Sequence, residues 1–197
     1  MSDFLAAAVQ LTSTSNVEAN FSLAEEQIEL ASRRGAELIG LPENFAFIGD
    51  DQERLKISSS LAEKCSQFLI TMARRYQVVL LGGGFPVPAG DGMRTLNRAE
   101  LVSRDGQLLG RYDKIHLFDV DLPDGNKYRE SETIVSGNKL PSVINIPVLC
   151  KVGLSICYDV RFPELYRHLV DQGAELLFIP AAFTLSLIHI SEPTRRY

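Results

Sequence analysis

Short apolar runs alternate along the chain with longer segments in which apolar residues recur at helical spacing. Phe4–Leu11, Leu38–Leu41 and Val78–Leu81 are mainly apolar and have the length of strands. Between them, apolar residues repeat every three or four positions from Val17 to Ala31 and from Leu61 to Tyr76, which is the period of an amphipathic helix. The alternation predicts an α/β fold in which helices cover the faces of a sheet.

The second half of the chain continues with shorter strands. An Asp-Gly pair, a signal for a hairpin turn, separates two of them, and the expected strands are Thr95–Ser103, Gln107–Tyr112, Val143–Ile146, Lys151–Ile156 and Leu176–Ile179. A helix should begin at Pro163 and end at Gly173. Residues 119–142 are rich in Asp, Gly, Pro and Asn and predict a long loop, which in a compact domain is usually functional.

One spacing occurs twice. Gly35-Ala36-Glu37-Leu38 followed by Pro42 matches Gly173-Ala174-Glu175-Leu176 followed by Pro180. Two related helix–strand units explain this repeat, and two similar turns that arose by chance explain it equally well.

Composition narrows the class of protein. The 197 residues are 45% hydrophobic and 23% charged, as expected for one globular domain. A net charge of −5 gives no electrostatic reason to expect nucleic acid or an anionic membrane as partner, and no apolar run approaches the ~18 residues of a membrane span. The N-terminus lacks the features of a signal peptide, and three cysteines do not make a disulfide framework. We expect a reducing compartment, cytoplasmic or within an organelle.

Among the three cysteines, Cys157 has the sequence context of a nucleophile. It ends an apolar strand and stands just before the helix at Pro163, a joint that exposes a side chain beside backbone N–H groups. A structural cysteine is the alternative. Cys65, on the apolar face of a helix, and Cys150, in a strand, are expected in the core.

A thiol nucleophile needs a base and charge stabilisation. His116 is the one histidine placed to act as a base, so a Cys–His dyad stays open. Glu43 is the stronger candidate, because it follows a strand without polar side chains and a carboxylate there can be a general base. Lys114 also follows a strand, and ligands of open α/β sheets gather at strand ends.

Three segments in order resemble the nitrilase, or carbon–nitrogen hydrolase, superfamily. They are Leu41-Pro42-Glu43-Asn44-Phe45, Tyr112-Asp113-Lys114-Ile115-His116 with the residues up to Asp121, and Gly153-Leu154-Ser155-Ile156-Cys157-Tyr158-Asp159 with the residues up to Glu164. The resemblance spans about Phe4 to Phe183. It implies a four-layer αββα sandwich.

The resemblance also implies roles for particular residues. Cys157 would attack the amide carbon and form a thioester, Glu43 would transfer the protons, and Lys114 would stabilise the oxyanion. Glu130 matches a second family glutamate that supports the lysine. Tyr158 and Arg161 are expected to contact the substrate. No metal and no organic cofactor are implied.

Within the superfamily, the segments Phe118–Pro123 and Tyr128–Ser131 look most like the deaminated glutathione amidases. The ω-amidases, which hydrolyse 2-oxoglutaramate, are the alternative. The implied partner is a small amide that also carries carboxylates. Arg161 could bind one of them, and an arginine bonded within the protein at the start of the helix is the alternative. We expect a homodimer or a higher homo-oligomer.

The end of the chain departs from the superfamily pattern. After Thr184 the residues 185–197 resemble nothing in it, so we expect a partial hydrolase domain over 1–184 and a tail of foreign origin. An incomplete sandwich would leave sheet edges and apolar faces uncovered. An inactive fragment, or a protein that serves only for association, is therefore the competing hypothesis.

Overall fold

The larger sheet of the fold contains five strands that lie in chain order. In the computed structural model, which describes residues 3–121, 125 and 127–182, these strands are β1 (Leu5–Ala8), β2 (Ala36–Gly40), β3 (Val79–Pro88), β4 (Thr95–Val102) and β5 (Leu108–Asp113). β1, β2 and β3 are parallel, whereas β4 and β5 are antiparallel to their neighbours. The expected tail at 185–197 lies outside the described residues, so it stays a prediction.

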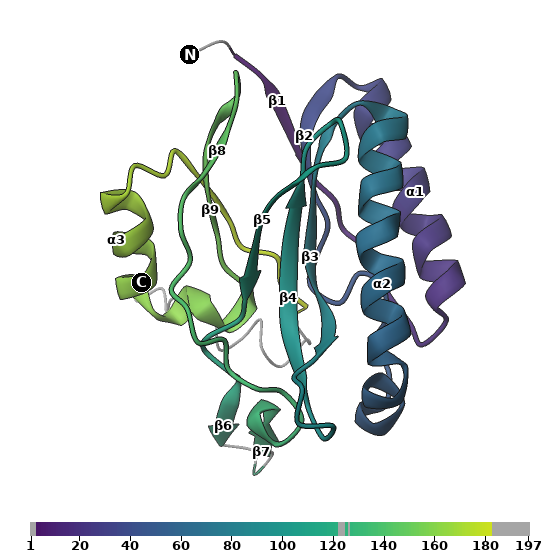
Figure 1. The fold of residues 1–197 in the computed structure, drawn as a ribbon, viewed down its shortest axis with the longest axis vertical. Helices are drawn as coiled ribbons and strands as arrows, with labels where there is room; N and C mark the ends of the chain where they lie inside the picture. The colour runs from purple at the N-terminus through teal and green to yellow at the C-terminus, as the bar shows by residue number, and fades with distance from the viewer. Residues whose placement is uncertain (1–2, 122–124, 126, 183–197) are drawn as a thin grey trace, which may run out of the picture.

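A second sheet faces the first across the core (Figure 1). Its order is β10 (Leu176–Phe178), β9 (Cys150–Leu154) and β8 (Ile144–Ile146). Helices α1 (Val17–Arg33) and α2 (Asp51–Tyr76) cover the outer face of the first sheet, and α3 (Pro163–Asp171) covers the second. The layers are therefore helix, sheet, sheet, helix, which confirms the αββα sandwich predicted from the sequence.

Both faces of the central strands are covered, which explains why these strands are continuously apolar. Side chains alternate along a strand, so Ile39 and Leu80 pack toward the helices while Leu38, Val79 and Leu81 pack toward the second sheet. From the opposite side, Val152, Leu154 and Ile156 fill the same inter-sheet core.

Side-chain capping explains where helices α1 and α2 begin. The Asn16 side chain accepts a hydrogen bond from the Ala19 N–H at the start of α1, and Asp50 accepts from the Gln52 and Glu53 N–H groups at the start of α2. α2 begins ten residues before Leu61, where the apolar pattern placed its first residue. Ile57 in the second turn still packs against the core, whereas the first turn is polar, so the cap at Asp50 was the better signal for the start of α2.

The structure also changes two expectations about loops. β3 continues through Gly82–Gly84 to Pro88, whereas the sequence predicted a strand that ends at Leu81. A bulge between Gly82 and Phe85 keeps β3 paired with β4. The segment 119–142 is not wholly a loop, because it contains the paired strands β6 (Asp119–Asp121) and β7 (Lys127–Arg129) and the 3₁₀ helix η1 (Glu130–Glu132).

The repeated spacing has a structural counterpart. Gly35 and Gly173 both have a φ of 89°, a value that favours glycine, and each joins a helix to a strand, one in each sheet. None of the helices in the described part of the chain combines the length and the apolar character that crossing a membrane requires.

Candidate active site

Four separate segments bring Glu43, Lys114, Glu130 and Cys157 together at the ends of strands. Glu43 lies on the turn after β2, Lys114 follows β5 directly, and Glu130 follows β7. Cys157 begins the 3₁₀ helix η2 (Cys157–Arg161), just beyond β9. We call these four residues, for which the sequence resemblance predicts catalytic roles, the catalytic cluster. The expectation that strand ends gather them therefore agrees with the geometry.

Lys114 is the central charge of the catalytic cluster. Its side chain is 2% exposed, and its Nζ lies 2.9 Å from both carboxylate oxygens of Glu130 and 3.4 Å from Glu43 Oε1. Burial by itself lowers the pKa of Lys114, but the charges of Glu43 and Glu130 outweigh burial and raise the pKa. The lysine therefore stays protonated between two carboxylates.

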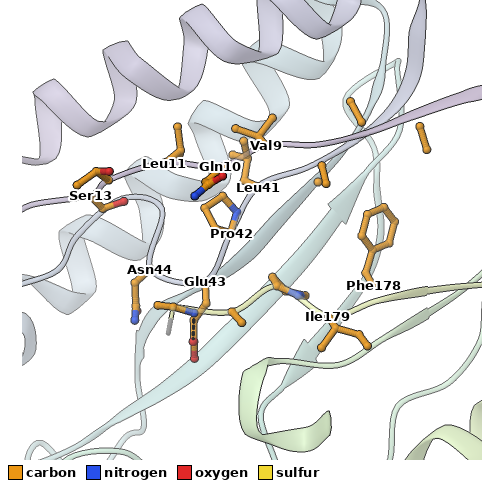
Figure 2. A pocket seen from close by; sticks show the side chains of 18 of the residues that line it. Val9, Gln10, Leu11, Ser13, Leu41, Pro42, Glu43, Asn44, Phe178 and Ile179 are labelled. Atoms are coloured by element: carbon orange, nitrogen blue, oxygen red, sulfur yellow. Dashed lines mark hydrogen bonds between the residues drawn. The ribbon is translucent and has the colours of Figure 1, made fainter. Parts of the chain in front are cut away.

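Both oxygens of Glu43 have hydrogen-bond donors. Oε1 accepts from Asn97 Nδ2 at 2.8 Å and from Lys114, while Oε2 accepts from the Ala182 N–H at 2.9 Å (Figure 2). These donors hold both oxygens of the Glu43 carboxylate in place. Glu130 is fixed in addition by the Phe118 N–H, which donates to its Oε2 at 2.6 Å.

Cys157 has an unusual backbone and a thiol that resists ionisation. Its φ of 50° lies in the left-handed region, a conformation found at functional turns, and its N–H donates to the Pro180 carbonyl at 2.8 Å. Burial, followed by the negative charge of Glu43, raises the pKa of the thiol, and the charge of Lys114 offsets only part of this. The resting side chain of Cys157 is therefore a neutral thiol.

The histidine considered as an alternative base has another partner. His116 Nδ1 lies 2.7 Å from Asp159 Oδ1, and the imidazole stacks on Phe162 with 3.6 Å between ring centres. Asp159 is fully buried and also accepts from the Tyr112 hydroxyl and the Ile156 N–H. This network joins the segment that follows Lys114 to the turn of Cys157, and it fixes His116 through Asp159 and Phe162.

The two residues expected to bind substrate lie on η2. The Tyr158 ring packs edge-on against Phe118 at 5.0 Å and against Phe162 at 5.7 Å. Arg161 is exposed at the end of η2, four residues after the cysteine. Both are near the cysteine in sequence, and their contact with a substrate stays a prediction.

The sequence did not predict two residues of the site, Asn97 and Gly84. Asn97 on β4 is buried and bonded to Glu43, and a Cβ on Gly84 would lie 2.7 Å from Asn97 Oδ1 and 3.3 Å from Glu43 Cγ. The missed signal for Asn97 is its position on the inward face of β4, which also carries Ala99 and Leu101. A polar residue among apolar inward neighbours indicates a buried partner.

A groove of about 1120 Å³ runs between β1 and β2 on one side and β10 on the other (Figure 2). Its walls are mostly apolar side chains such as Val9, Leu11, Phe178 and Ile179. Of the catalytic cluster, Glu43 lines this groove, together with Ala182, whose N–H donates to Glu43.

Comparison with known proteins identifies the family of this chain. Residues 5–194 match the family described as carbon-nitrogen hydrolase. The chain belongs to the carbon–nitrogen hydrolase family. This membership confirms the resemblance drawn from the three sequence segments. The match extends beyond Thr184, and the domain boundary expected there stays a prediction.

Individual relatives of this carbon–nitrogen hydrolase are amidases. The chain is 55% identical to a deaminated glutathione amidase of Synechocystis over 93% of its own length and 68% of the relative. It is 34% identical to omega-amidase NIT2 of Homo sapiens over 94% of the chain and 66% of the relative. Among solved structures, the NitFhit protein of C. elegans superimposes with a TM-score of 0.84 at 34% identity, covering 91% of this chain and 44% of that one. The chain thus spans about two thirds of the length of these two amidases and less than half of the NitFhit protein.

Proposed function

We propose that the protein hydrolyses the amide bond of a small carboxylate-bearing molecule of the deaminated glutathione type, with Cys157 as nucleophile. The observation on which this proposal rests is the buried catalytic cluster, in which a thiol, a carboxylate base and a cation converge from distant segments. The 55% identity to a deaminated glutathione amidase supports the choice of substrate.

Glu43 is the proton carrier of the proposed mechanism. It takes the proton from the Cys157 thiol while the sulfur bonds to the amide carbon and the carbonyl electron pair moves to oxygen. When the tetrahedral intermediate collapses, Glu43 returns the proton to the departing nitrogen, and ammonia or an amine leaves. Glu43 then takes a proton from water, which attacks the thioester, and Cys157 regains its hydrogen when the acid product leaves.

The neutral resting thiol suits this carboxylate base. A thiolate in front of Glu43 would place two negative charges side by side, whereas proton transfer during attack avoids that state. Lys114 compensates the charge that appears on the carbonyl oxygen. The Cys157 N–H is already bonded to Pro180, so the following backbone N–H, that of Tyr158, is the donor proposed for the oxyanion.

An ω-amidase acting on 2-oxoglutaramate is the second candidate, supported by the identity to omega-amidase NIT2. Both candidate substrates carry carboxylates, and we propose that Arg161 and Tyr158 contact them from η2. Arginine suits this role because its guanidinium binds carboxylates through two parallel hydrogen bonds.

Product release from the two candidate substrates tests the proposal. Amine release from deaminated glutathione and ammonia release from 2-oxoglutaramate are measured for the wild-type protein, Cys157→Ala and Cys150→Ala. Cys150 is a matched control, because it is also a buried free thiol but lies on β9, outside the catalytic cluster. Loss of turnover in Cys157→Ala alone is the expected result. Equal turnover in Cys157→Ala and wild type would contradict the proposed nucleophile, and no turnover by wild type would favour the inactive or association-only alternative.

Two further properties remain proposals. All three cysteines are free thiols, and a thiol nucleophile works in a reducing compartment, so we propose the cytoplasm. We also propose a homodimer or a higher homo-oligomer, whose subunit number light scattering would measure.

A further inference from the structure

Asn97 connects two members of the catalytic cluster. Its side chain on β4 is 4% exposed, its Nδ2 donates to Glu43 Oε1 at 2.8 Å, and its backbone carbonyl accepts from the Lys114 N–H at 2.9 Å. The amide therefore touches the base directly and fixes the start of the segment that holds the cation.

The hydrogen bonds of Glu43 distinguish its two oxygens. A carboxylate oxygen has two lone pairs, and those of Oε1 are engaged by Asn97 Nδ2 and by Lys114 Nζ at 3.4 Å. Oε2 accepts the Ala182 N–H and, among the described residues, has one lone pair left. Oε2 is therefore the oxygen of Glu43 that can accept a further proton.

We propose that Asn97 is a positioning residue that reserves Oε2 of Glu43 for the proton of Cys157. This inference rests on the proposed amidase function and adds the atom that performs the transfer. The S–H bond breaks as the O–H bond forms on Oε2, and the S–C bond forms as the carbonyl pair moves to oxygen. The same O–H then gives its proton to the nitrogen as the C–N bond breaks.

The other half of the Asn97 amide indicates why this residue is present. Its Oδ1 is buried without a hydrogen-bond partner in the described structure. An unpaired buried acceptor destabilises a fold, so a leucine of similar size would serve packing at least as well. The carbonyl oxygen fits only because Gly84, with a φ of 113°, has no Cβ. Stability therefore does not account for Asn97, whereas its bond to Glu43 does.

Two substitutions and one matched control test the inference. Asn97→Leu removes the donor and the unpaired oxygen together, and we expect kcat to fall about 10- to 100-fold. The melting temperature should change little, because the lost bond to Glu43 and the removed unpaired oxygen have opposite effects on stability. Asn97→Asp places a second carboxylate beside Glu43, and we expect the acidic limb of the kcat/KM profile to move to higher pH. Thr95→Val is the control, because Thr95 on the same strand also has a buried hydroxyl without a partner, but no bond to Glu43. Its kcat and pH profile should match wild type.

The outcomes are separable. A kcat of Asn97→Leu within about twofold of wild type overturns the inference, since a single lost charge-assisted bond should exceed that. An unchanged pH profile in Asn97→Asp, together with a lowered melting temperature, overturns it as well, because it indicates a purely structural role. If wild type hydrolyses neither amide, the proposed function fails, and Asn97 is judged by the rate at which iodoacetamide alkylates Cys157. Slower alkylation in Asn97→Leu than in Thr95→Val then supports the positioning role, and equal rates refute it.

Discussion

Replacing Lys114 by methionine tests whether the catalytic cluster is held together by charge. The substitution keeps the length of the side chain but removes a cation bonded to Glu130 at 2.9 Å and to Glu43 at 3.4 Å. The side chains of Lys114 and Glu43 are 2% and 5% exposed, so water screens this charge little. Two carboxylates would remain buried without their counter-charge.

The expected loss of stability is large. Removing one partner of a buried ion pair costs about 3–5 kcal/mol of unfolding free energy. For a chain of this size each kcal/mol lowers the melting temperature by about 2–4 °C, which gives a decrease of about 6–20 °C. Thermal unfolding followed by circular dichroism at neutral pH measures this change.

Lys64→Met is the matched control for this experiment. Lys64 lies 2.8 Å from Glu18, yet the two side chains are 55% and 76% exposed. A surface pair of this kind contributes about 0–1 kcal/mol, so the melting temperature should hardly change. Adding Glu130→Gln to Lys114→Met should recover part of the loss, because one unpaired charge disappears. Equal melting temperatures for Lys114→Met and Lys64→Met would refute the assignment of a buried charge network.

Two further predictions concern the surroundings of Glu43. Gly84→Ala should lower the unfolding free energy, measured by urea titration, by about 1–3 kcal/mol and should reduce turnover. The reason is that the new Cβ meets Asn97 and Glu43 at a positive φ. Gly90→Ala is the control, because Gly90 has a φ of 89° with open space around it and should show only the smaller backbone effect. The raised pKa of Cys157 stabilises the fold fully below the unfolded thiol value of 9.0, and this contribution is lost as pH rises above it. The unfolding free energy, measured by urea titration between pH 8 and about 10.5, should therefore fall less steeply with pH in Cys157→Ala than in wild type. The two slopes should differ by up to about 1.4 kcal/mol per pH unit. Equal slopes would contradict the raised pKa.

Local patterns determined much of the fold. The period of apolar residues fixed the type and order of most helices and strands, because each pattern arises from neighbours along one element. The same patterns placed Glu43, Lys114 and Cys157 at strand ends, where parallel and mixed sheets collect functional groups. The start of α2 was missed because its first turn is polar. The end of β3 was missed because glycines at a bulge resemble those of a turn.

The chemical geometry of the site depended on contacts between distant segments. Glu43 meets Lys114 across 71 positions of sequence, Asn97 across 54 and Ala182 across 139. Strand pairing within the first sheet closes the separations to Lys114 and Asn97, because β2, β4 and β5 all belong to it. The stacking of the second sheet closes the separation to Ala182, which follows β10. The sequence alone could leave His116 as a possible base, whereas the packed structure pairs it with Asp159.

The amino-acid sequence by itself thus determined the α/β sandwich, its family and the residue types available for amide hydrolysis. Only the tertiary structure decided which oxygen of Glu43 is open to a proton, that the Cys157 thiol rests neutral, and that Asn97 belongs to the site. The physical reason is that burial and charge act through space. They depend on which side chains meet once both sheets are packed, and not on their order along the chain.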